Sequence, residues 1–527
     1  MEMNRKQFVL VLRQHFGKAH VSQVSDRRVE IHVEREEMVE VCRYLKTQEQ
    51  ARLLTMVGTD ERPLGASFGL YYVYSIDRYQ LVVTVAVMIP EDDPTFPSMA
   101  VEFPSLNWYE REVNDLLGLR AVGHPDRSPL VLKAGWPSDA YPLRKDYDRE
   151  QKQPIVDVPE DVLEYEGNEV VEVPVGPIHA GIIEPGHFRF GVLGDNVLHL
   201  DARLFYTHRG VEKMMEGMTL DGGIIAAERT CGVCAFSHGL AYAHAIEDAA
   251  HTVVPKRAQY LRAIFGELER IYNHVGDVGN ICAGFGFAIG INHGARLKEK
   301  LLQLNEEMTG NRYLRGVVRA GGMRRDWSEE ELERIVTVLN EVEAEFDEIT
   351  DILLSHEIAL NRMATTGIVP LEKAEALEVV GVGGRASGRK TDSRIDQPYD
   401  AYAELRPQLI IDEHGDVLAR ISVRVREAKE AMNLVREAVL KMPAGDIYAP
   451  IASIPAGTIG VGWAESARGE NCHWIMIGER NTIYRYRIRS AAYSNWPAVA
   501  LAVPGNIVPD FPLINKSFEL CYACCDR

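Results

Sequence analysis

The chain has 527 residues, of which 46% are hydrophobic and 26% charged, so it is expected to fold into more than one globular domain. Its formal net charge of −19 argues against nucleic acid as a partner, because binding to phosphate requires a basic surface. No segment is long and apolar enough to span a bilayer and no signal peptide is recognisable, so we expect any membrane role to come through partner subunits.

The N-terminal part, residues 1–150, is predicted to be a small α/β domain. Helical spacing of apolar residues alternates there with runs of β-branched and aromatic residues that are typical of strands. The predicted elements are helices at residues 4–17 and 36–48 and strands at residues 69–75 and 80–89. A polar, acidic stretch with prolines and no apolar period follows, and we predict a linker at residues 151–168.

The C-terminal part, residues 169–527, is predicted to be a large and mainly helical domain. Pro255 is suited to the first turn of a long amphipathic helix. A capping-box pattern at residues 328–331 opens a second long helix that extends to about Ser355, and a third covers residues 423–441. Long helices around one core predict a bundle. The expected fold class is therefore α+β, with a small α/β domain followed by a large, mainly helical one.

Two Cys-x-x-Cys pairs carry the strongest chemical signal, Cys231-Gly-Val-Cys234 and Cys521-Tyr-Ala-Cys524. One pair alone predicts a thioredoxin-like redox motif or half of a zinc site. A zinc ribbon keeps its second pair close in sequence and a redox motif needs no distant partner, so two remote pairs weaken both interpretations. Four thiolates favour a soft transition metal over calcium or magnesium. A structural zinc site built from both pairs remains the alternative.

The other four cysteines show no ligand spacing. Cys42 and Cys282 have apolar neighbours and are predicted to be small buried hydrophobes. Cys472 and Cys525 are not assigned to the metal. Because no ligand pattern for an iron–sulfur cluster is left, we expect no such cluster in this chain and a separate subunit that carries electrons.

Several motifs give the C-terminal part a family resemblance. Some of them place histidine, arginine or acidic side chains beside glycine, where the backbone can approach closely. The motifs are Arg229-Thr-Cys-Gly-Val-Cys-Ala-Phe-Ser-His238, His208-Arg-Gly-Val-Glu-Lys213, Gly322-Met-Arg-Arg-Asp326, and Tyr484-Arg-Tyr-Arg487 with Asn495-Trp-Pro497. With them, residues 173–527 resemble the large subunit of nickel–iron hydrogenases, in the membrane-associated, energy-converting group (group 4) that is related to respiratory complex I.

The N-terminal part resembles the thirty-kilodalton subunit of complex I, and the fusion of both parts resembles the large subunits of the formate hydrogenlyase type. The motifs that carry this likeness are Trp108-Tyr-Glu-Arg-Glu-Val-Asn-Asp-Leu-Leu-Gly118, Gly123-His-Pro-Asp126 and Tyr141-Pro-Leu-Arg-Lys-Asp-Tyr147. The resemblance covers nearly the whole chain. It implies that the larger domain folds like the forty-nine-kilodalton subunit of complex I.

The resemblance implies a nickel–iron centre held by thiolates. Cys231, Cys234, Cys521 and Cys524 would bind nickel, and Cys234 and Cys524 would bridge to an iron that carries carbon monoxide and cyanide. The implied reaction is the reversible reduction of two protons by two electrons to dihydrogen.

The resemblance also implies roles for residues around that centre. Cys521 would take up a proton in catalysis and pass it to Glu184. Arg468 would overhang the open metal position, where its guanidinium would polarise the bound molecule. Glu212 and the end of the chain would hold a divalent ion, magnesium or iron, although Arg527 replaces the histidine that is common in the family.

The segment before the second cysteine pair departs from the family pattern. Glu519-Leu520 stands where relatives have Asp-Pro, but the spacing of the cysteines is kept, so we expect metal ligation to survive. The terminal segment must enter the interior to reach the first pair, and metal binding would then fasten it. We therefore predict that both Cys521 and Cys524 are buried.

The implied partners are an iron–sulfur small subunit like the twenty-kilodalton subunit of complex I, a ferredoxin-like iron–sulfur subunit and integral membrane subunits. A formate or carbon monoxide dehydrogenase is a further partner class. The chain is expected to be cytoplasmic and peripheral on the inner face of the cytoplasmic membrane.

The rival interpretation is a complex I-type quinone-site scaffold without metal, in which His179 of Gly176-Pro-Ile-His179 would face the quinone. Metal analysis distinguishes the three interpretations, because a hydrogenase would contain nickel plus iron, a quinone-site scaffold no metal, and a structural site zinc.

Overall fold

A computed structural model of the chain describes residues 5–65, 67–156, 158, 169–179 and 183–527. The chain divides into two compact units, residues 1–164 and residues 165–527. Their boundary falls inside the stretch predicted to be a linker, but residues 157 and 159–168 lie outside the described part, so the linker stays a prediction. Among the described residues, no helix has the length and apolar character that a membrane crossing requires.

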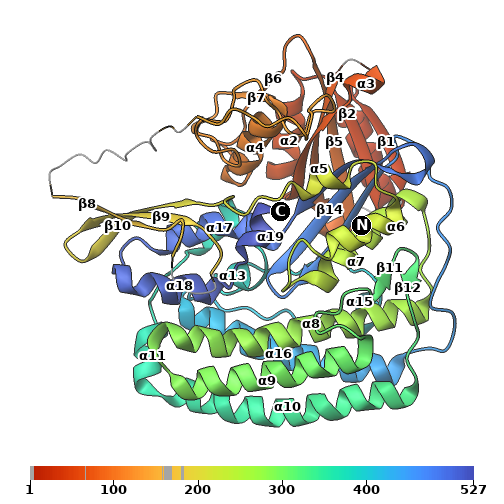
Figure 1. Ribbon diagram of the computed structural model, residues 1–527. Helices are drawn as coiled ribbons and strands as arrows, with labels where there is room; N and C mark the ends of the chain where they lie inside the picture. The colour runs from red at the N-terminus through yellow and green to blue at the C-terminus, as the bar shows by residue number, and fades with distance from the viewer. Residues whose placement is uncertain (1–4, 66, 157, 159–168, 180–182) are drawn as a thin grey trace. The chain divides into compact units, whose positions relative to one another are not determined.

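The first unit is built on a five-stranded sheet with the strand order β1-β2-β5-β4-β3 (Figure 1). β2 and β5 run parallel, and the other neighbours are antiparallel. The strands are β1 (His20–Ser25), β2 (Arg28–Val33), β3 (Arg52–Asp60), β4 (Ser67–Ile76) and β5 (Leu81–Pro90). The other elements are α1 (Arg5–His15), α2 (Met38–Thr47), α3 (Arg62–Gly65), α4 (Asn107–Leu117), β6 (Thr95–Pro97) and β7 (Arg120–Val122). The two predicted helices and two predicted strands are confirmed as α1, α2, β4 and β5.

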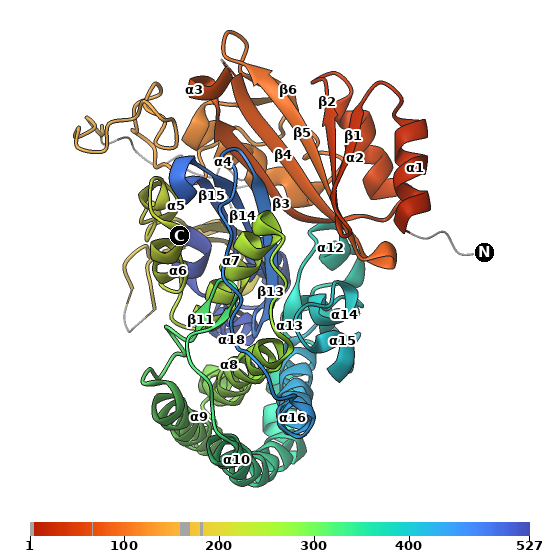
Figure 2. The same ribbon diagram turned by 90° about the vertical axis from the view of Figure 1, so that its right-hand side faces the viewer.

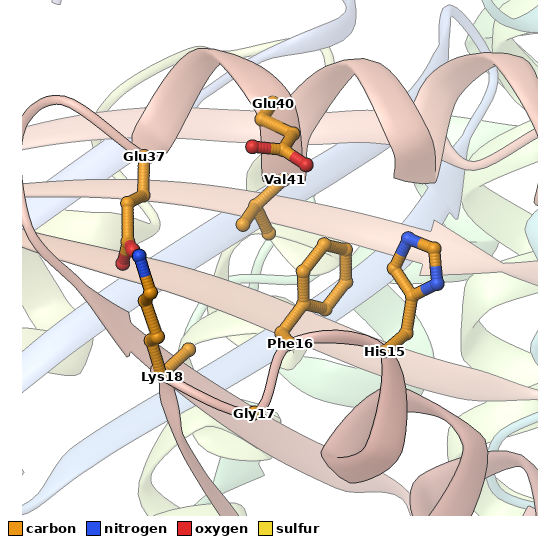
Figure 3. A pocket seen from close by; sticks show the side chains of 8 residues that line it. His15, Phe16, Gly17, Lys18, Glu37, Glu40 and Val41 are labelled. Carbon is orange, nitrogen blue, oxygen red and sulfur yellow. The ribbon is translucent and has the colours of Figure 1, made fainter.

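A pocket of the first unit lies where α1 ends and α2 begins (Figure 3). Phe16 and Val41 contribute apolar surface, and Lys18, Glu37 and Glu40 contribute charged groups. No cysteine lines it. The pocket therefore does not belong to the predicted thiolate chemistry.

The long helices of the second unit form the predicted bundle (Figures 1 and 2). Its members are α8 (Lys256–Cys282), α9 (Ala288–Thr309), α10 (Glu329–Ser355) and α16 (Val417–Lys441). α8 contacts α9 and α16, and α10 contacts the same two helices. Their apolar side chains belong to one large buried core, which stabilises the bundle through the hydrophobic effect.

The starts of these helices follow from local sequence signals. The Ser328 hydroxyl accepts a hydrogen bond from the Glu331 N–H (3.2 Å), and the Glu331 carboxylate accepts one from the Ser328 N–H (2.8 Å), so the predicted capping box is confirmed. Pro255 immediately precedes α8. α16 begins at Val417, earlier than predicted, because the Asp416 carboxylate caps it.

A three-stranded antiparallel sheet, which the sequence patterns do not predict, packs against α7 (Ala235–Ala250). Its strands are β13 (Ile459–Ser466), β14 (Gly469–Ile477) and β15 (Ile483–Arg489). Gly460 and Gly462 explain the close approach, because a Cβ atom there would lie 1.9 Å from the Ala245 carbonyl oxygen and 2.2 Å from that of Ala241. This contact fixes the turn between β13 and β14 relative to α7.

The remaining elements of the second unit are short. A second antiparallel sheet has the order β10-β9-β8, and a two-residue ladder joins β11 and β12. The strands are β8 (Val171–Val175), β9 (His187–Leu193), β10 (Asn196–Arg203), β11 (Val318–Arg319) and β12 (Gly322–Met323). The helices are α5 (Val211–Met215), α6 (Leu220–Ala227), α11 (Glu357–Met363), α12 (Leu371–Ala376), α13 (Gly381–Arg385), α14 (Ser393–Asp396), α15 (Tyr402–Leu405), α17 (Ala491–Ala502), α18 (Phe511–Phe518) and α19 (Tyr522–Asp526). Helices and strands together confirm the α+β class.

Candidate metal centre

Two loops bring the predicted cysteine ligands to one place. Cys231 and Cys234 lie in the turn between α6 and α7, and Cys521 and Cys524 lie at the start of α19 and within it. The sulfurs of Cys231, Cys234 and Cys524 are buried and lie within 4.8 Å of one another. The thiol of Cys521 hydrogen-bonds with that of Cys231. The structure therefore joins the two distant pairs into one thiol cluster, made of these four residues.

The second pair differs from the prediction in its exposure. Cys524 is buried as predicted, but Cys521 keeps partial exposure, so the prediction of burial is wrong for Cys521. Its backbone is extended and it precedes the first turn of α19, just after Glu519 ends α18 with a left-handed conformation (φ 54°). The turning chain covers Cys521 less completely than the helix covers Cys524. Cys521 is thus the most exposed of the four residues.

Crowding in the thiol cluster opposes ionisation of all four groups together. Hydrogen bonding to Cys231 raises the pKa of Cys234 and of Cys521 well above its ordinary value. The pKa of Cys231 is lowered, first by its hydrogen bond with Cys234 and then by those with the second pair. A bound metal cation would resolve this conflict, because it binds sulfur in the deprotonated form. The residues present therefore fit a thiolate-bound metal.

Helix α8 fixes the loop that carries the first pair. The Glu269 carboxylate accepts hydrogen bonds from the N–H groups of Phe236 (2.7 Å) and Ser237 (3.1 Å), which satisfies donors that the start of α7 leaves open. The Tyr272 hydroxyl donates to the carbonyl of Val233 between the two cysteines (3.0 Å). The first pair is thereby held at the N-terminus of α7, where the helix dipole favours thiolates.

Arg209 ties the two loops together. Its guanidinium donates to the carbonyls of Arg229 (3.0 Å) and Thr230 (2.7 Å) in the first loop and to that of Ala523 (2.9 Å) in the second. Its backbone N–H also donates to the carbonyl of Arg527 (2.7 Å). One arginine from the His208–Lys213 motif therefore holds both halves of the thiol cluster, a role that the motif alone did not indicate.

Glu184 lies against the second loop. Its Oε2 atom accepts a hydrogen bond from the N–H of Ala523 (2.7 Å), between the two cysteines of that pair. Among the described contacts, none joins Glu184 to the sulfur of Cys521, so proton transfer between them stays a prediction. The described contacts likewise include no hydrogen bond from His179, the residue of the rival interpretation, to any of the four thiols.

Arg468 occupies the turn between β13 and β14 and is 5% exposed. Its guanidinium forms a two-pronged ion pair with Asp277 of α8, with 2.9 Å between Nη2 and Oδ1 and a second contact between Nη1 and Oδ2. A thiolate at Cys521 would also attract this guanidinium. Burial disfavours the charged form of Asp277, but Arg468, together with His274 and Arg424, more than offsets this and holds the pKa of the carboxyl below its usual range. The side chain is therefore fixed beside the thiol cluster.

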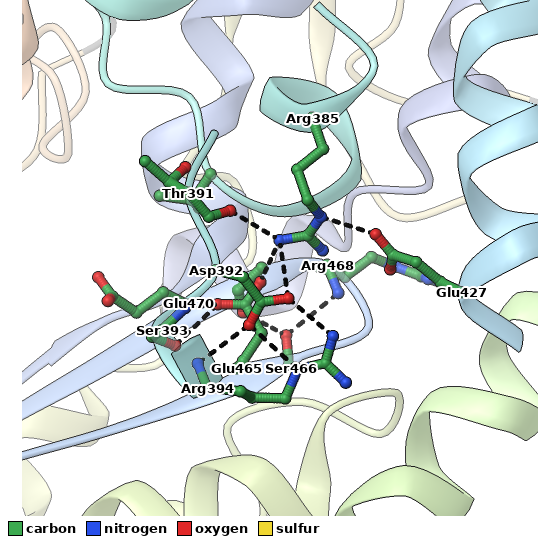
Figure 4. A network of polar contacts seen from close by, with 12 residues as sticks. Arg385, Thr391, Asp392, Ser393, Arg394, Glu427, Glu465, Ser466, Arg468 and Glu470 are labelled. Atoms are coloured by element: carbon green, nitrogen blue, oxygen red, sulfur yellow. Dashed lines mark hydrogen bonds and ion pairs between the residues drawn. The ribbon is translucent and has the colours of Figure 1, made fainter. Parts of the chain in front are cut away.

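A buried ionic network supports the turn of Arg468 (Figure 4). Arg385 donates to Glu427 (2.6 Å) and to Glu465 (2.8 Å), which lies near the end of β13. The Ser466 hydroxyl closes the turn by accepting a hydrogen bond from the Arg468 N–H (3.2 Å). The glycine- and arginine-rich segment of residues 383–392 thus stabilises the turn, because paired buried charges fix its position.

Glu519, which departs from the family pattern, also faces this arginine. Its Oε2 lies 3.9 Å from Nη2 of Arg468, and its Oε1 accepts a hydrogen bond from the side chain of Asn280 (2.6 Å). Burial, with the nearby charge of Asp277, raises the pKa of Glu519 to about 7. The longer glutamate therefore still places a carboxyl group beside Arg468.

A chain of three fully buried polar side chains ends on Cys524. Nε2 of His238 lies 3.2 Å from the sulfur of Cys524, and Nδ1 of His238 lies 2.9 Å from Nε2 of His473. Nδ1 of His473 lies 2.5 Å from the hydroxyl of Tyr486. The sequence indicates His238 and Tyr486 only as parts of motifs and gives no sign of His473, since nothing in its neighbourhood points to a shared site.

The surroundings of Glu212 do not fit a divalent ion. Its carboxylate pairs with the guanidinium groups of Arg527 (3.0 Å), Arg485 (3.2 Å) and Arg487 (3.4 Å). The N–H of Ile488 donates to the same carboxylate (2.9 Å). A divalent cation here would face three positive groups, and their repulsion in a buried site would be strong. The expectation of magnesium or iron at Glu212 therefore has no support in the side chains present.

Comparisons with known proteins connect this geometry to a family. A family profile described as "Nickel-dependent hydrogenase" matches residues 209–277, which include the first cysteine pair. The profile of the "Respiratory-chain NADH dehydrogenase, 49 Kd subunit" matches residues 285–456 and 450–527, and that of the 30 Kd subunit matches residues 31–153.

Whole-length relatives are found among hydrogenases and among complex I subunits. Formate hydrogenlyase subunit 5 of Escherichia coli (strain K12) is 35% identical over 93% of this chain and 87% of its own length. Hydrogenase-4 component G of the same organism is 34% identical over 93% and 86%. The C/D subunit of NADH-quinone oxidoreductase from Phocaeicola vulgatus is 28% identical over 88% and 92%. The chain therefore belongs to the family of energy-converting, complex I-related nickel–iron hydrogenase large subunits with a fused domain of the complex I thirty-kilodalton type.

Proposed function

We propose that the thiol cluster holds a nickel–iron centre at which this chain catalyses the reversible reduction of two protons to dihydrogen. The observation that carries the proposal is the convergence of three buried sulfurs within 4.8 Å, with Cys521 beside them, from loops at opposite ends of the unit's sequence. All four cysteines would bind nickel, and Cys234 and Cys524 would bridge to an iron with carbon monoxide and cyanide ligands. When bound, the centre supplies the cleavage and formation of dihydrogen.

Cys521 is the residue suited to hold the proton. It is the most exposed of the four cysteine residues, which favours it over the three buried ones for proton exchange. Glu184 would receive the proton from Cys521, because its carboxylate is fixed against the same turn through the N–H of Ala523.

Arg468 would orient and polarise the molecule at the open side of the centre. Its ion pair with Asp277 fixes the plane of the guanidinium, and a fixed cation in a dry site acts more strongly than a mobile one. Glu519 contributes a second carboxyl on the same guanidinium.

Electrons would come from a separate iron–sulfur small subunit, and a ferredoxin-like subunit would feed it. The support is that four of the eight cysteines form the thiol cluster and the others show no cluster spacing. Membrane subunits, together with a formate or carbon monoxide dehydrogenase, would complete a complex on the cytoplasmic face of the membrane. The names of the relatives, which include formate hydrogenlyase, support this assembly.

Metal analysis of the purified complex tests the proposal. We expect nickel together with iron, with iron in excess because the iron–sulfur subunits also contain it, and loss of nickel when any one of the four cysteines is replaced by serine. Cys282→Ser is the matched control, because Cys282 is a free, fully buried cysteine outside the thiol cluster and should leave nickel unchanged. Zinc in place of nickel would indicate a structural metal site, and an absence of metal together with quinone binding would indicate a scaffold. Full retention of nickel in Cys521→Ser would rule out a four-thiolate site.

A further inference from the structure

We propose that Tyr486 and His473 are positioning residues that fix His238 as a hydrogen-bond donor to the thiolate of Cys524. The inference deepens the proposed function and rests on it, since it takes Cys524 to be a metal-bound thiolate. It concerns three side chains from separate elements, His238 of α7, His473 of β14 and Tyr486 of β15. Each is fully buried.

The direction of the chain follows from what each atom can donate. A thiolate only accepts hydrogen bonds, so Nε2 of His238, 3.2 Å from the sulfur, must carry a hydrogen. In a neutral imidazole Nδ1 then has a free electron pair, so it must accept from Nε2–H of His473, 2.9 Å away. Nδ1 of His473 in turn must accept from the hydroxyl of Tyr486. One arrangement of hydrogens satisfies every contact.

The opposite direction is unfavourable. If Tyr486 accepted rather than donated, the hydrogens of both rings would exchange places, and Nε2 of His238 would present an electron pair to the thiolate. Two electron-rich atoms 3.2 Å apart in a buried site repel each other. The thiolate thus selects the tautomer of His238, and the hydroxyl of Tyr486 stabilises it through His473, because it donates to the Nδ1 atom of the ring whose Nε2–H His238 accepts.

The neutral state of the chain agrees with its surroundings. No carboxylate within the described part of the chain hydrogen-bonds to either ring, so a second proton on His473 would create a buried cation that has no anion among its hydrogen-bond partners. Burial lowers the pKa of His473 well below its ordinary value and raises the pKa of Tyr486 well above it. The phenol thus keeps the hydrogen that it donates.

The chain would act on the metal centre through the sulfur. An N–H group that donates to a thiolate withdraws negative charge from it, which favours the more reduced state of the metal that the sulfur binds. Loss of this hydrogen bond should therefore move the midpoint potential of the centre to a more negative value. The four sulfurs themselves would stay in place.

The test uses Tyr486→Phe in the complete purified complex, which removes the hydroxyl and keeps the ring. Tyr242→Phe is the matched control, because Tyr242 is equally buried, packs against Tyr486 with 5.5 Å between the ring centroids, and donates to the carbonyl of Leu220 instead (2.8 Å). Solid-state NMR of ¹⁵N-labelled histidine, assigned with His238→Gln and His473→Gln, reports the tautomers. Redox titration of the nickel signal reports the potential.

We expect Nε2–H at both rings in the wild type and in Tyr242→Phe. In Tyr486→Phe we expect a mixture of tautomers, unchanged nickel content and a more negative potential. Unchanged tautomers in Tyr486→Phe, an equal change in Tyr242→Phe, or loss of nickel from Tyr486→Phe alone would overturn the inference. The tautomer measurement requires only a thiolate at Cys524, so it tests the inference even if the wild type holds zinc. Zinc in the wild type would refute the proposed function but not this inference.

Discussion

Replacement of Arg468 by lysine should reduce turnover while leaving the metal content unchanged. The variant keeps one positive charge but loses the planar fork that grips both oxygens of Asp277. The fork is directed at that carboxylate, whereas the first cysteine pair is held by α8 and Arg209. Nickel binding should therefore survive the change.

The size of the effect follows from the lost hydrogen bond. A charge-assisted hydrogen bond in a buried site contributes about 1.5–3 kcal/mol, and each 1.4 kcal/mol in activation free energy changes a rate about tenfold. If the fixed guanidinium acts mainly in the transition state, Arg468→Lys should lose about 10- to 100-fold in rate. The assay is hydrogen evolution from a reduced artificial donor, expressed per nickel in the same preparation.

Arg262→Lys provides the matched control for this experiment. Arg262 is fully buried and forms a comparable two-pronged ion pair with Glu247, and its other partners are Asp400 and two backbone carbonyls rather than any part of the thiol cluster. Its replacement should lower stability without lowering the rate per nickel. Full activity of Arg468→Lys at wild-type nickel content would refute the role assigned to the guanidinium.

Three further predictions address stability. Arg527→Ala removes a buried partner of Glu212 and should lower the free energy of unfolding by about 1.5–3 kcal/mol. The variant should show a lower Tm and a lower nickel content. Brief chelation of divalent ions from the intact complex should change neither quantity. Burial raises the pKa of Glu110 from 4.5 to about 7. The contribution of this carboxyl to stability is therefore complete below the unfolded pKa and is lost as the pH rises through 7. Over this range the Tm of the wild type should fall relative to that of Glu110→Gln, and parallel plots of Tm against pH for the two proteins would contradict the reasoning. Gly462→Ala places a Cβ atom 2.2 Å from a carbonyl oxygen of α7 and should lower the free energy of unfolding by about 1–3 kcal/mol. The control is Gly17→Ala, whose Cβ meets nothing within 4 Å, and it should leave the Tm unchanged.

The parts of the fold that were predictable have local signals. The capping box at Ser328 is readable because both of its hydrogen bonds lie within four residues. The sheet β13–β15 was missed because its signal is not local. In β15, Arg485 and Arg487 suggest a solvent-exposed segment, yet both side chains are buried and pair with Glu212 on α5. Only the tertiary structure brings that carboxylate to the strand.

The candidate site was predictable to a similar extent. The spacing within each cysteine pair restricts both sulfurs to one turn, so the pairs could be recognised, and the family motif then joined them. Asp277 and His473 had no such signal, because one lies in a long helix and the other in a strand that the sequence patterns do not predict. Their roles depend on side chains from other elements that point to the same place, which a single sequence does not encode locally.

Helix α19 is attached at both of its ends, and Arg527 makes the second attachment. At its start the thiol cluster would fasten Cys521 and Cys524 once metal is bound. At its end the guanidinium of Arg527 donates to the carboxylate of Glu212 and to the carbonyl of Ile488, each over 3.0 Å. The guanidinium supplies Glu212 with a positive partner that belongs to the chain and needs no free metal. In this chain no divalent ion would then be needed at the end of the segment, because Arg527 would hold it there instead.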